Sequence, residues 1–337
     1  KYKLLPTLVQ LQSDITSPFP PLDLMVHIGE ISAASFNDTI PAKEVWRVSE
    51  DGELRDPFKK LTTVFQMSEE MFFLHYGKDG CNRHVLIDEC RELFGEIYEQ
   101  IPELPFCNIW TAMQLSSRLP KGALFHMGVS NTRRCWNMFQ LPESVESACN
   151  VGCCGIDGCV STLVGASLVN PDRLCYVVVG DLTFFYDLNS LGNHHIGTNL
   201  RVMLVNNGRG TEFRLGIHHC NVFGDDADKY MAAAGHFGNK SPLLVKHYAE
   251  DLGFHYLSAT TKEEFMTALS NFTNPQLSDH SMILEVFTDS KDESEALYLM
   301  SHIQSDAKGM VRSKLKDAVR NVAGEKGINA IKKILKK

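Results

Sequence analysis

The chain of 337 residues is 44% hydrophobic and 22% charged, which excludes collagen-like, disordered and coiled-coil proteins. No apolar run reaches the ~18–20 residues that span a bilayer, so we expect a soluble, cytoplasmic protein. The net charge of −8 is unevenly distributed, because residues 308–337 hold ten basic and two acidic residues and the rest of the chain is acidic. A nucleic-acid-binding core needs positive charge beside its binding face, so we expect no nucleic-acid partner.

The ten cysteines form no C-x-x-C pair, and four of them lie within residues 149–159. This spacing is too tight for a regular disulfide framework and does not match the usual ligand spacing of structural zinc sites. We therefore expect reduced thiols, as in cytosolic proteins.

The first 80 residues resemble part of an α/β domain. Apolar runs at 22–29 and 44–48, each followed by turn residues, predict buried parallel strands, and the aromatic run 71–76 is a third candidate strand. The composition turns polar at 77–80, where we place a domain boundary.

Residues 81–290 alternate between helical and extended patterns, which predicts a parallel sheet with helices on both faces. The predicted strands are 123–127, 174–179, 201–205 and 281–287. The predicted helices are 86–100, 108–118, 158–169, 183–191, 230–237 and 241–252.

The pattern of residues 291–337 predicts a basic, helical C-terminal tail. Apolar residues recur at helical spacing on one side, and Lys and Arg lie on the other. One interpretation is a helix that docks on the body of the protein with Lys residues at its C-terminus. The other is attachment to an anionic membrane surface or an acidic partner.

Polar residues follow two consecutive predicted strands of the second domain. Strand 174–179 ends in Gly180-Asp181, and strand 201–205 ends in Asn206-Asn207, with Asn207 26 positions after Asp181. In open α/β sheets, ligands bind at the carboxyl ends of the strands, and carboxylate and amide oxygens suit Mg²⁺. Taken alone, Asp181 is equally well interpreted as a helix cap.

Three sequence blocks in this order carry a family resemblance: 128–134, 150–158 and 180–213. A strand ending in Gly-Asp, a return of about 26 residues and a strand ending in Asn-Asn-Gly resemble the diphosphate-binding domain of thiamine-diphosphate enzymes. Across residues 22–287 the chain is similar to the menaquinone-pathway SEPHCHC synthases, which join 2-oxoglutarate to isochorismate.

The resemblance implies a thiamine-diphosphate-binding fold, thiamine diphosphate and Mg²⁺ as cofactors, and a homodimer or higher oligomer. The implied reaction is decarboxylation of a 2-oxo acid and transfer of the acyl-carbanion equivalent to an acceptor. The alternatives are a 2-oxo acid decarboxylase, an acetolactate-type ligase, or a non-catalytic assembly module that retains the fold.

The resemblance also implies roles for individual residues. The Mg²⁺ ligands would be the side chains of Asp181 and Asn207 and the backbone oxygen of Arg209. The cofactor-binding residues would be Gly155, Ile156, Gly180, Asp181, Leu182, Thr183, Asn207, Arg209 and Gly210. The substrate-binding residues would be Ser130, Arg134 and Phe213.

Three of these residues have simpler alternatives. Ile156 would support the bent cofactor or be an ordinary core residue, and Phe213 would be a wall above the thiazolium or a core aromatic. Arg134 would bind a substrate carboxylate in bidentate fashion or lie on the surface.

The chain departs from the family at two positions. Val151 stands where the family has a carboxylate-binding Arg, and Glu212 stands where an apolar residue is expected. Both changes make the succinyl substrate uncertain and leave the cofactor motif intact.

The Glu that activates the cofactor in this family belongs to a separate pyrimidine-binding domain, for which we find no segment in this chain. We therefore expect a C-terminal portion of such an enzyme, truncated before residue 1, with no catalytic residue of its own and inactive in isolation.

Overall fold

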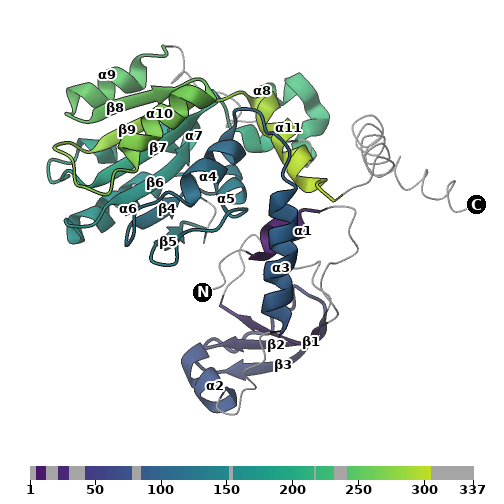
Figure 1. Cartoon of the computed structure of the whole chain (residues 1–337). Helices are drawn as coiled ribbons and strands as arrows, with labels where there is room; N and C mark the ends of the chain where they lie inside the picture. Colours follow the sequence, from purple (N-terminus) through teal and green to yellow (C-terminus); the bar gives the residue numbers. More distant parts are fainter. Residues whose placement is uncertain are drawn as a thin grey trace, which may run out of the picture.

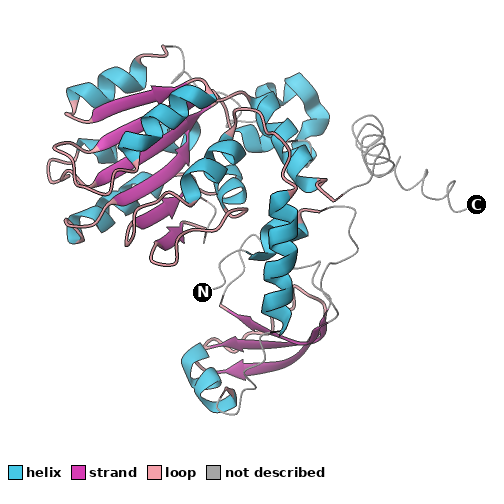
Figure 2. Cartoon of the chain, in the orientation of Figure 1, coloured by secondary structure: helices cyan, strands magenta, loops and turns pink. Residues whose placement is uncertain are grey.

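The computed structural model describes residues 5–12, 22–29, 42–77, 85–151, 155–215, 218–230 and 241–304. Two sheets organise this part of the chain, one of three strands and one of six, and every pairing in both sheets is parallel (Figures 1 and 2). The α/β class predicted from the sequence is thereby confirmed. Within these residues, no helix is both long and apolar enough to cross a membrane.

The small sheet has the order β1-β2-β3. Its strands are β1 (Leu22–Ile28), β2 (Ala42–Ser49) and β3 (Leu61–Gln66). The predicted strands 22–29 and 44–48 are confirmed as β1 and β2, whereas β3 was not predicted. The predicted strand 71–76 is wrong, because these residues lie in helix α2 (Glu69–Tyr76).

Local signals explain why α2 is a helix. The side chain of Ser68 caps its N-terminus by accepting a hydrogen bond from the backbone N–H of Met71, and Glu69 and Glu70 place negative charge in the first turn. Phe72 is buried, with its ring 5.0 Å from that of Phe65 on β3. The aromatic run thus covers the sheet as a helix and does not extend it.

The large sheet has the order β5-β4-β6-β7-β9-β8 (Figure 1). Its strands are β4 (Leu124–Met127), β5 (Glu146–Cys149), β6 (Cys175–Gly180), β7 (Leu200–Asn206), β8 (His255–Ala259) and β9 (Met282–Phe287). The four predicted strands are confirmed as β4, β6, β7 and β9. The sequence analysis missed β5 and β8, the two edge strands.

Helices cover both faces of this sheet, and buried side chains divide into two clusters accordingly. One face packs against α4 (Asn108–Ser116), α5 (Asn131–Trp136), α10 (Lys262–Phe272) and α11 (Ser290–Ser301). The other packs against α6 (Cys159–Val169), α7 (Asp181–Tyr186), the 3-10 helix η2 (Leu188–Gly192) and α9 (Leu244–Asp251). Buried on both faces, β6 and β7 consist of almost continuous apolar residues.

Most predicted helices of the second domain are present. The predicted helix 183–191 is divided between α7 and η2, and helix 230–237 lies outside the described residues after Tyr230, where α8 (Ala227–Tyr230) ends. Two further 3-10 helices, η3 (Thr211–Arg214) and η4 (His219–Asp226), follow β7. All the cysteines that the structure describes are free thiols.

Two further helices, α1 (Leu5–Gln10) and α3 (Val85–Glu99), lie next to each other (Figure 1). Both contribute buried residues to the cluster that also contains α11. Leu8 of α1 and Ile97 of α3 are fully buried in the same cluster as Met300 of α11. The Gln12 side chain donates to the backbone oxygens of Leu8 (3.0 Å) and Met300 (2.9 Å). The domain boundaries at 80 and 290 stay predictions.

The predicted tail region 291–337 begins within helix α11 (Ser290–Ser301), which is anchored by a buried carboxyl group. Glu293 is 1% exposed, and its Oε1 accepts hydrogen bonds from the backbone N–H of Asn108 and the hydroxyl of Thr288, both at 2.9 Å. Burial is the main cause that raises the pKa of Glu293 to about 7, and the charge of Asp292 adds to it. Residues 305–337 lie outside the described residues.

We expect Glu293→Gln to flatten the pH dependence of stability. The pKa of Glu293 is about 7 in the folded protein and 4.5 when unperturbed, so its contribution to the free energy of unfolding falls as the pH rises through this interval. The change approaches about 3 kcal/mol at 1.36 kcal/mol per pKa unit. Denaturant unfolding at pH 5 and pH 8 measures it, with Glu295→Gln, an exposed residue of the same helix, as the control. Equal slopes in both variants would contradict the prediction.

Candidate functional site

The residues predicted to bind a metal follow two adjacent strands at the centre of the large sheet. Gly180, the last residue of β6, pairs with Val205 of β7. Asp181 is the first residue of α7, directly after β6, and Asn207 directly follows β7. Strands β6 and β7 lie side by side in the sheet (Figure 1). Because they are parallel, both residues lie at the same carboxyl edge.

Asp181 is 2% exposed, and its Oδ1 accepts a hydrogen bond from the backbone N–H of Leu182 at 2.8 Å. The N-cap of α7 is Gly180, which has no side chain, so Asp181 is not the N-cap residue itself. A Cβ at Gly180 would meet no atom of the described residues within 4 Å. Among the described residues, the space next to Gly180 is therefore open.

The loop after β7 turns sharply. Gly208 has a φ of +79°, a left-handed conformation that favours glycine, and the side-chain oxygen of Asn207 accepts from the backbone N–H of Arg209 at 3.4 Å. Asn206 is buried, and its side-chain oxygen accepts from the backbone N–H of Gly208 at 3.3 Å. Asn206 thus supports the turn from inside, and Asn207 lies half-buried at the edge.

A buried carboxyl group behind this loop was not found in the sequence analysis. Glu285 of β9 is 1% exposed and accepts hydrogen bonds from the amide of Asn206 and the hydroxyl of Tyr256, each at 2.7 Å. Burial raises the pKa of Glu285 and the charge of Asp181 raises it further, while the two hydrogen bonds oppose this. A single Glu inside an otherwise apolar strand was the available signal.

The donor set at this edge is one carboxylate, one amide oxygen and backbone oxygens. No group of three or more His, Cys, Asp or Glu side chains that could hold a metal occurs among the described residues. Mg²⁺ accepts a half-shell of few protein oxygens when water and phosphate oxygens complete its six ligands. The residues present therefore fit Mg²⁺ bound together with a diphosphate, and they do not form an all-protein metal cage.

The block 150–158 is described only in part, because residues 152–154, with Cys153 and Cys154, lie outside the described residues. The amide of Asn150 donates to the carbonyl of Gly158 and the hydroxyl of Thr162, both at 3.1 Å, and so holds the two ends of the loop together. Ile156 is half-buried and belongs to neither core cluster, and Gly155 is also half-buried. The role of Ile156 stays a prediction.

The predicted substrate residues lie on two segments. Ser130 has φ +59° and ψ −122°, an unusual conformation for a residue with a side chain, and it precedes α5 without a side-chain capping bond. Phe213 lies in η3, half-buried, with its ring 5.2 Å from that of His218. Strained residues such as Ser130 often occur at functional sites.

Arg134 does not lie free on the surface, because it forms a bidentate ion pair with Glu212. The two guanidinium nitrogens each lie 2.7 Å from one carboxylate oxygen, and the side chains are 16% and 21% exposed. Burial by itself lowers the pKa of Arg134, but its hydrogen bonds to Glu212 and the charge of that residue outweigh burial and raise it. The ion pair joins α5 to η3.

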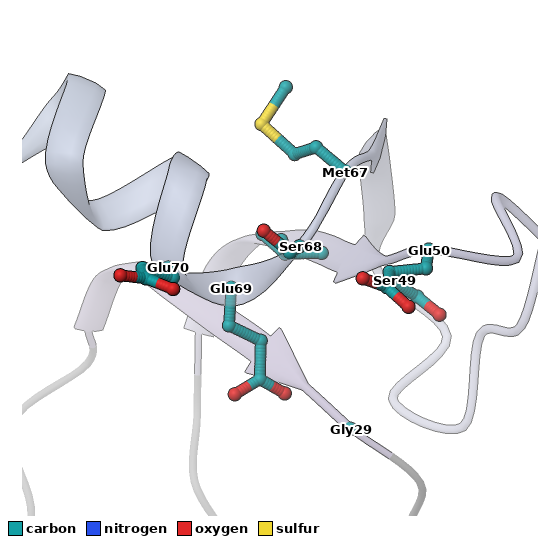
Figure 3. A pocket seen from close by; sticks show the side chains of 8 residues that line it. Gly29, Ser49, Glu50, Met67, Ser68, Glu69 and Glu70 are labelled. Carbon is teal, nitrogen blue, oxygen red and sulfur yellow. The ribbon is translucent and has the colours of Figure 1, made fainter.

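A separate pocket of about 440 Å³ lies at the carboxyl end of the small sheet, beside the start of α2 (Figure 3). Three of its lining residues are acidic: Glu50, Glu69 and Glu70. None of the predicted site residues lines it, so the predicted cofactor site and this pocket belong to different sheets.

No protein-family model matches the chain. It is similar to curated proteins named 2-succinyl-5-enolpyruvyl-6-hydroxy-3-cyclohexene-1-carboxylate (SEPHCHC) synthase. The one from Bacteroides fragilis is 33% identical over 263 residues, which cover 76% of this chain and 45% of the relative. Those from Phocaeicola vulgatus and Bacteroides thetaiotaomicron are each 32% identical, over 265 and 259 residues, and cover 76% of this chain and 44% of the relative.

The chain thus spans less than half the length of these curated relatives. The resemblance predicted from the three sequence blocks is confirmed: over three quarters of its length, this α/β chain resembles the SEPHCHC synthases.

Proposed function

We propose that this chain forms the thiamine-diphosphate- and Mg²⁺-binding part of an enzyme that decarboxylates a 2-oxo acid and transfers the resulting acyl unit to an acceptor. The observation that carries the proposal is the position of Asp181 and Asn207 after the adjacent strands β6 and β7. The similarity to SEPHCHC synthases supports the same assignment.

In this proposal the side chains of Asp181 and Asn207 and the backbone oxygen of Arg209 hold Mg²⁺. The diphosphate lies against residues from both loops and the start of α7: Gly155, Gly180, Leu182, Thr183 and Gly210. Ile156 supports the cofactor from the side of loop 150–158. When bound, thiamine diphosphate supplies the carbanion chemistry, and the protein supplies position and electrostatics.

The substrate lies between Ser130 and Phe213, beside Arg134. The Glu that activates the cofactor comes from a pyrimidine-binding domain, on this polypeptide or on a partner subunit of a homodimer or higher oligomer. We place the enzyme in the cytoplasm. If its 2-oxo acid is 2-oxoglutarate, as in the SEPHCHC synthases it resembles, it belongs to menaquinone biosynthesis. Membrane contact by the basic residues 308–337 remains an interpretation of the sequence alone.

A panel of 2-oxo acids tests the reaction, with the pyrimidine-binding domain present and CO₂ release followed with and without isochorismate. We expect CO₂ release that requires thiamine diphosphate and Mg²⁺. If the enzyme is a SEPHCHC synthase, it also consumes isochorismate as CO₂ is released. Release of CO₂ that does not respond to isochorismate would instead favour a simple decarboxylase or an acetolactate-type ligase, an alternative supported by the Arg134–Glu212 ion pair. If thiamine diphosphate does not bind, the non-catalytic assembly module is the interpretation that is left.

A further inference from the structure

The Arg134–Glu212 ion pair links the two loops that the proposed function assigns to substrate and metal. Arg134 lies in α5, which follows β4, and Glu212 lies in η3, which follows the metal loop 207–210. Although 78 positions separate the two residues, both hydrogen bonds are 2.7 Å long. The fork of the guanidinium is therefore filled by a carboxylate that belongs to the protein itself.

A carboxylate of a substrate binds an arginine through the same fork geometry. To reach Arg134 in this way, it would have to displace Glu212 and break two charge-assisted hydrogen bonds. Glu212 is only 21% exposed, so its displaced carboxylate would stay partly out of water and close to the incoming negative charge. Binding of an anionic group at Arg134 is opposed by both effects.

We propose that Glu212 determines the substrate class of this site, by occupying Arg134 and selecting 2-oxo acids with an uncharged side group over 2-oxo diacids. This inference rests on the proposed function, because it takes Arg134 as the residue beside the substrate's side group. Val151 is consistent with it, since this half-buried residue of the neighbouring block carries no charge.

The test compares 2-oxoglutarate with 2-oxopentanoate, a monoacid of the same chain length, as ligands of the 337-residue chain in the presence of thiamine diphosphate and Mg²⁺. Titration calorimetry gives the ratio of their dissociation constants for the unmodified protein and for Glu212→Gln. The Gln side chain keeps the shape and can accept one hydrogen bond from Arg134, so the variant removes the negative charge with little change in packing. The control is Glu146→Gln, which removes an exposed carboxylate paired with Arg173.

We expect the unmodified protein to bind 2-oxopentanoate at least about 10-fold more tightly than 2-oxoglutarate, since one charge-assisted hydrogen bond corresponds to about that factor. Glu212→Gln should remove or reverse this preference, Glu146→Gln should not, and Arg134→Gln combined with Glu212→Gln should abolish the gain for 2-oxoglutarate. An unchanged ratio in Glu212→Gln, or tighter binding of 2-oxoglutarate to the unmodified protein, overturns the inference.

The same ratio can be measured without cofactor, from the increase in unfolding temperature that each 2-oxo acid produces. A chain that fails to bind thiamine diphosphate but still shows the ligand preference and its reversal would contradict the proposed function alone. A chain that binds the cofactor but shows no effect of Glu212→Gln would contradict the inference alone.

Discussion

Replacing Asp181 by Asn is expected to lower the affinity for thiamine diphosphate in the presence of Mg²⁺ on the order of 100-fold or more, because residues that merely orient metal ligands already contribute ~10–100-fold. The Asn side chain can still accept the hydrogen bond from the backbone N–H of Leu182, so the start of α7 should be retained. Its amide lacks the negative charge that compensates for removing Mg²⁺ from water.

Titration calorimetry with Mg²⁺ and with excess chelator measures this effect. The control is Asp172→Asn, which removes one negative charge from an exposed turn before β6 and should bind the cofactor normally. An equal melting temperature of the variant and the unmodified protein would show that folding is intact. Retained Mg²⁺-dependent affinity in Asp181→Asn would remove Asp181 from the metal site.

Replacing Trp136 by Ala is expected to lower the free energy of unfolding by about 3–5 kcal/mol, the usual cost of truncating a large buried aromatic residue. Trp136 is 1% exposed, and its ring lies 5.0 Å from that of Phe125 on β4. Its indole N–H donates to the side-chain oxygen of Asn108 at 3.1 Å, so the substitution also leaves a buried acceptor without this partner.

Chemical denaturation measures the loss, and Trp136→Phe separates its two components. The Phe variant keeps most of the ring packing and loses the hydrogen bond, so it should cost only about 1–2 kcal/mol. A loss below about 1 kcal/mol in Trp136→Ala would mean that α5 is not held by this residue. Because α5 also carries Arg134, we expect the Ala variant to weaken binding at that arginine as well.

Most of the large sheet could be predicted from local patterns. The strands β6 and β7 are buried on both faces, so their sequences are continuous apolar runs with turn residues after them, and this signal does not depend on the rest of the fold. The edge strands β5 and β8 are only partly buried and mix polar with apolar residues. Such strands resemble surface loops until the neighbouring strand is known.

The aromatic run 71–76 shows the opposite failure. Its composition favours a strand, but the cap at Ser68 and packing against β3 favour a helix, and tertiary packing prevailed over intrinsic preference. Glu285 was missed for a related reason. The role of a carboxylate in an apolar strand follows from its hydrogen-bond partners, here the side chains of Asn206 and Tyr256, and these are known only from the tertiary structure.

The sequence by itself determined the α/β class, the four central strands and the placement of Asp181 and Asn207 after consecutive strands, because each depends on residues close together in the chain. It also identified Arg134 and Glu212 separately, one as an expected anion-binding residue and the other as a departure from the family. Only the tertiary structure showed that they are partners, since side chains 78 positions apart meet only when β4 and β7 have taken their places in one sheet. Our proposal on the substrate class rests on that contact.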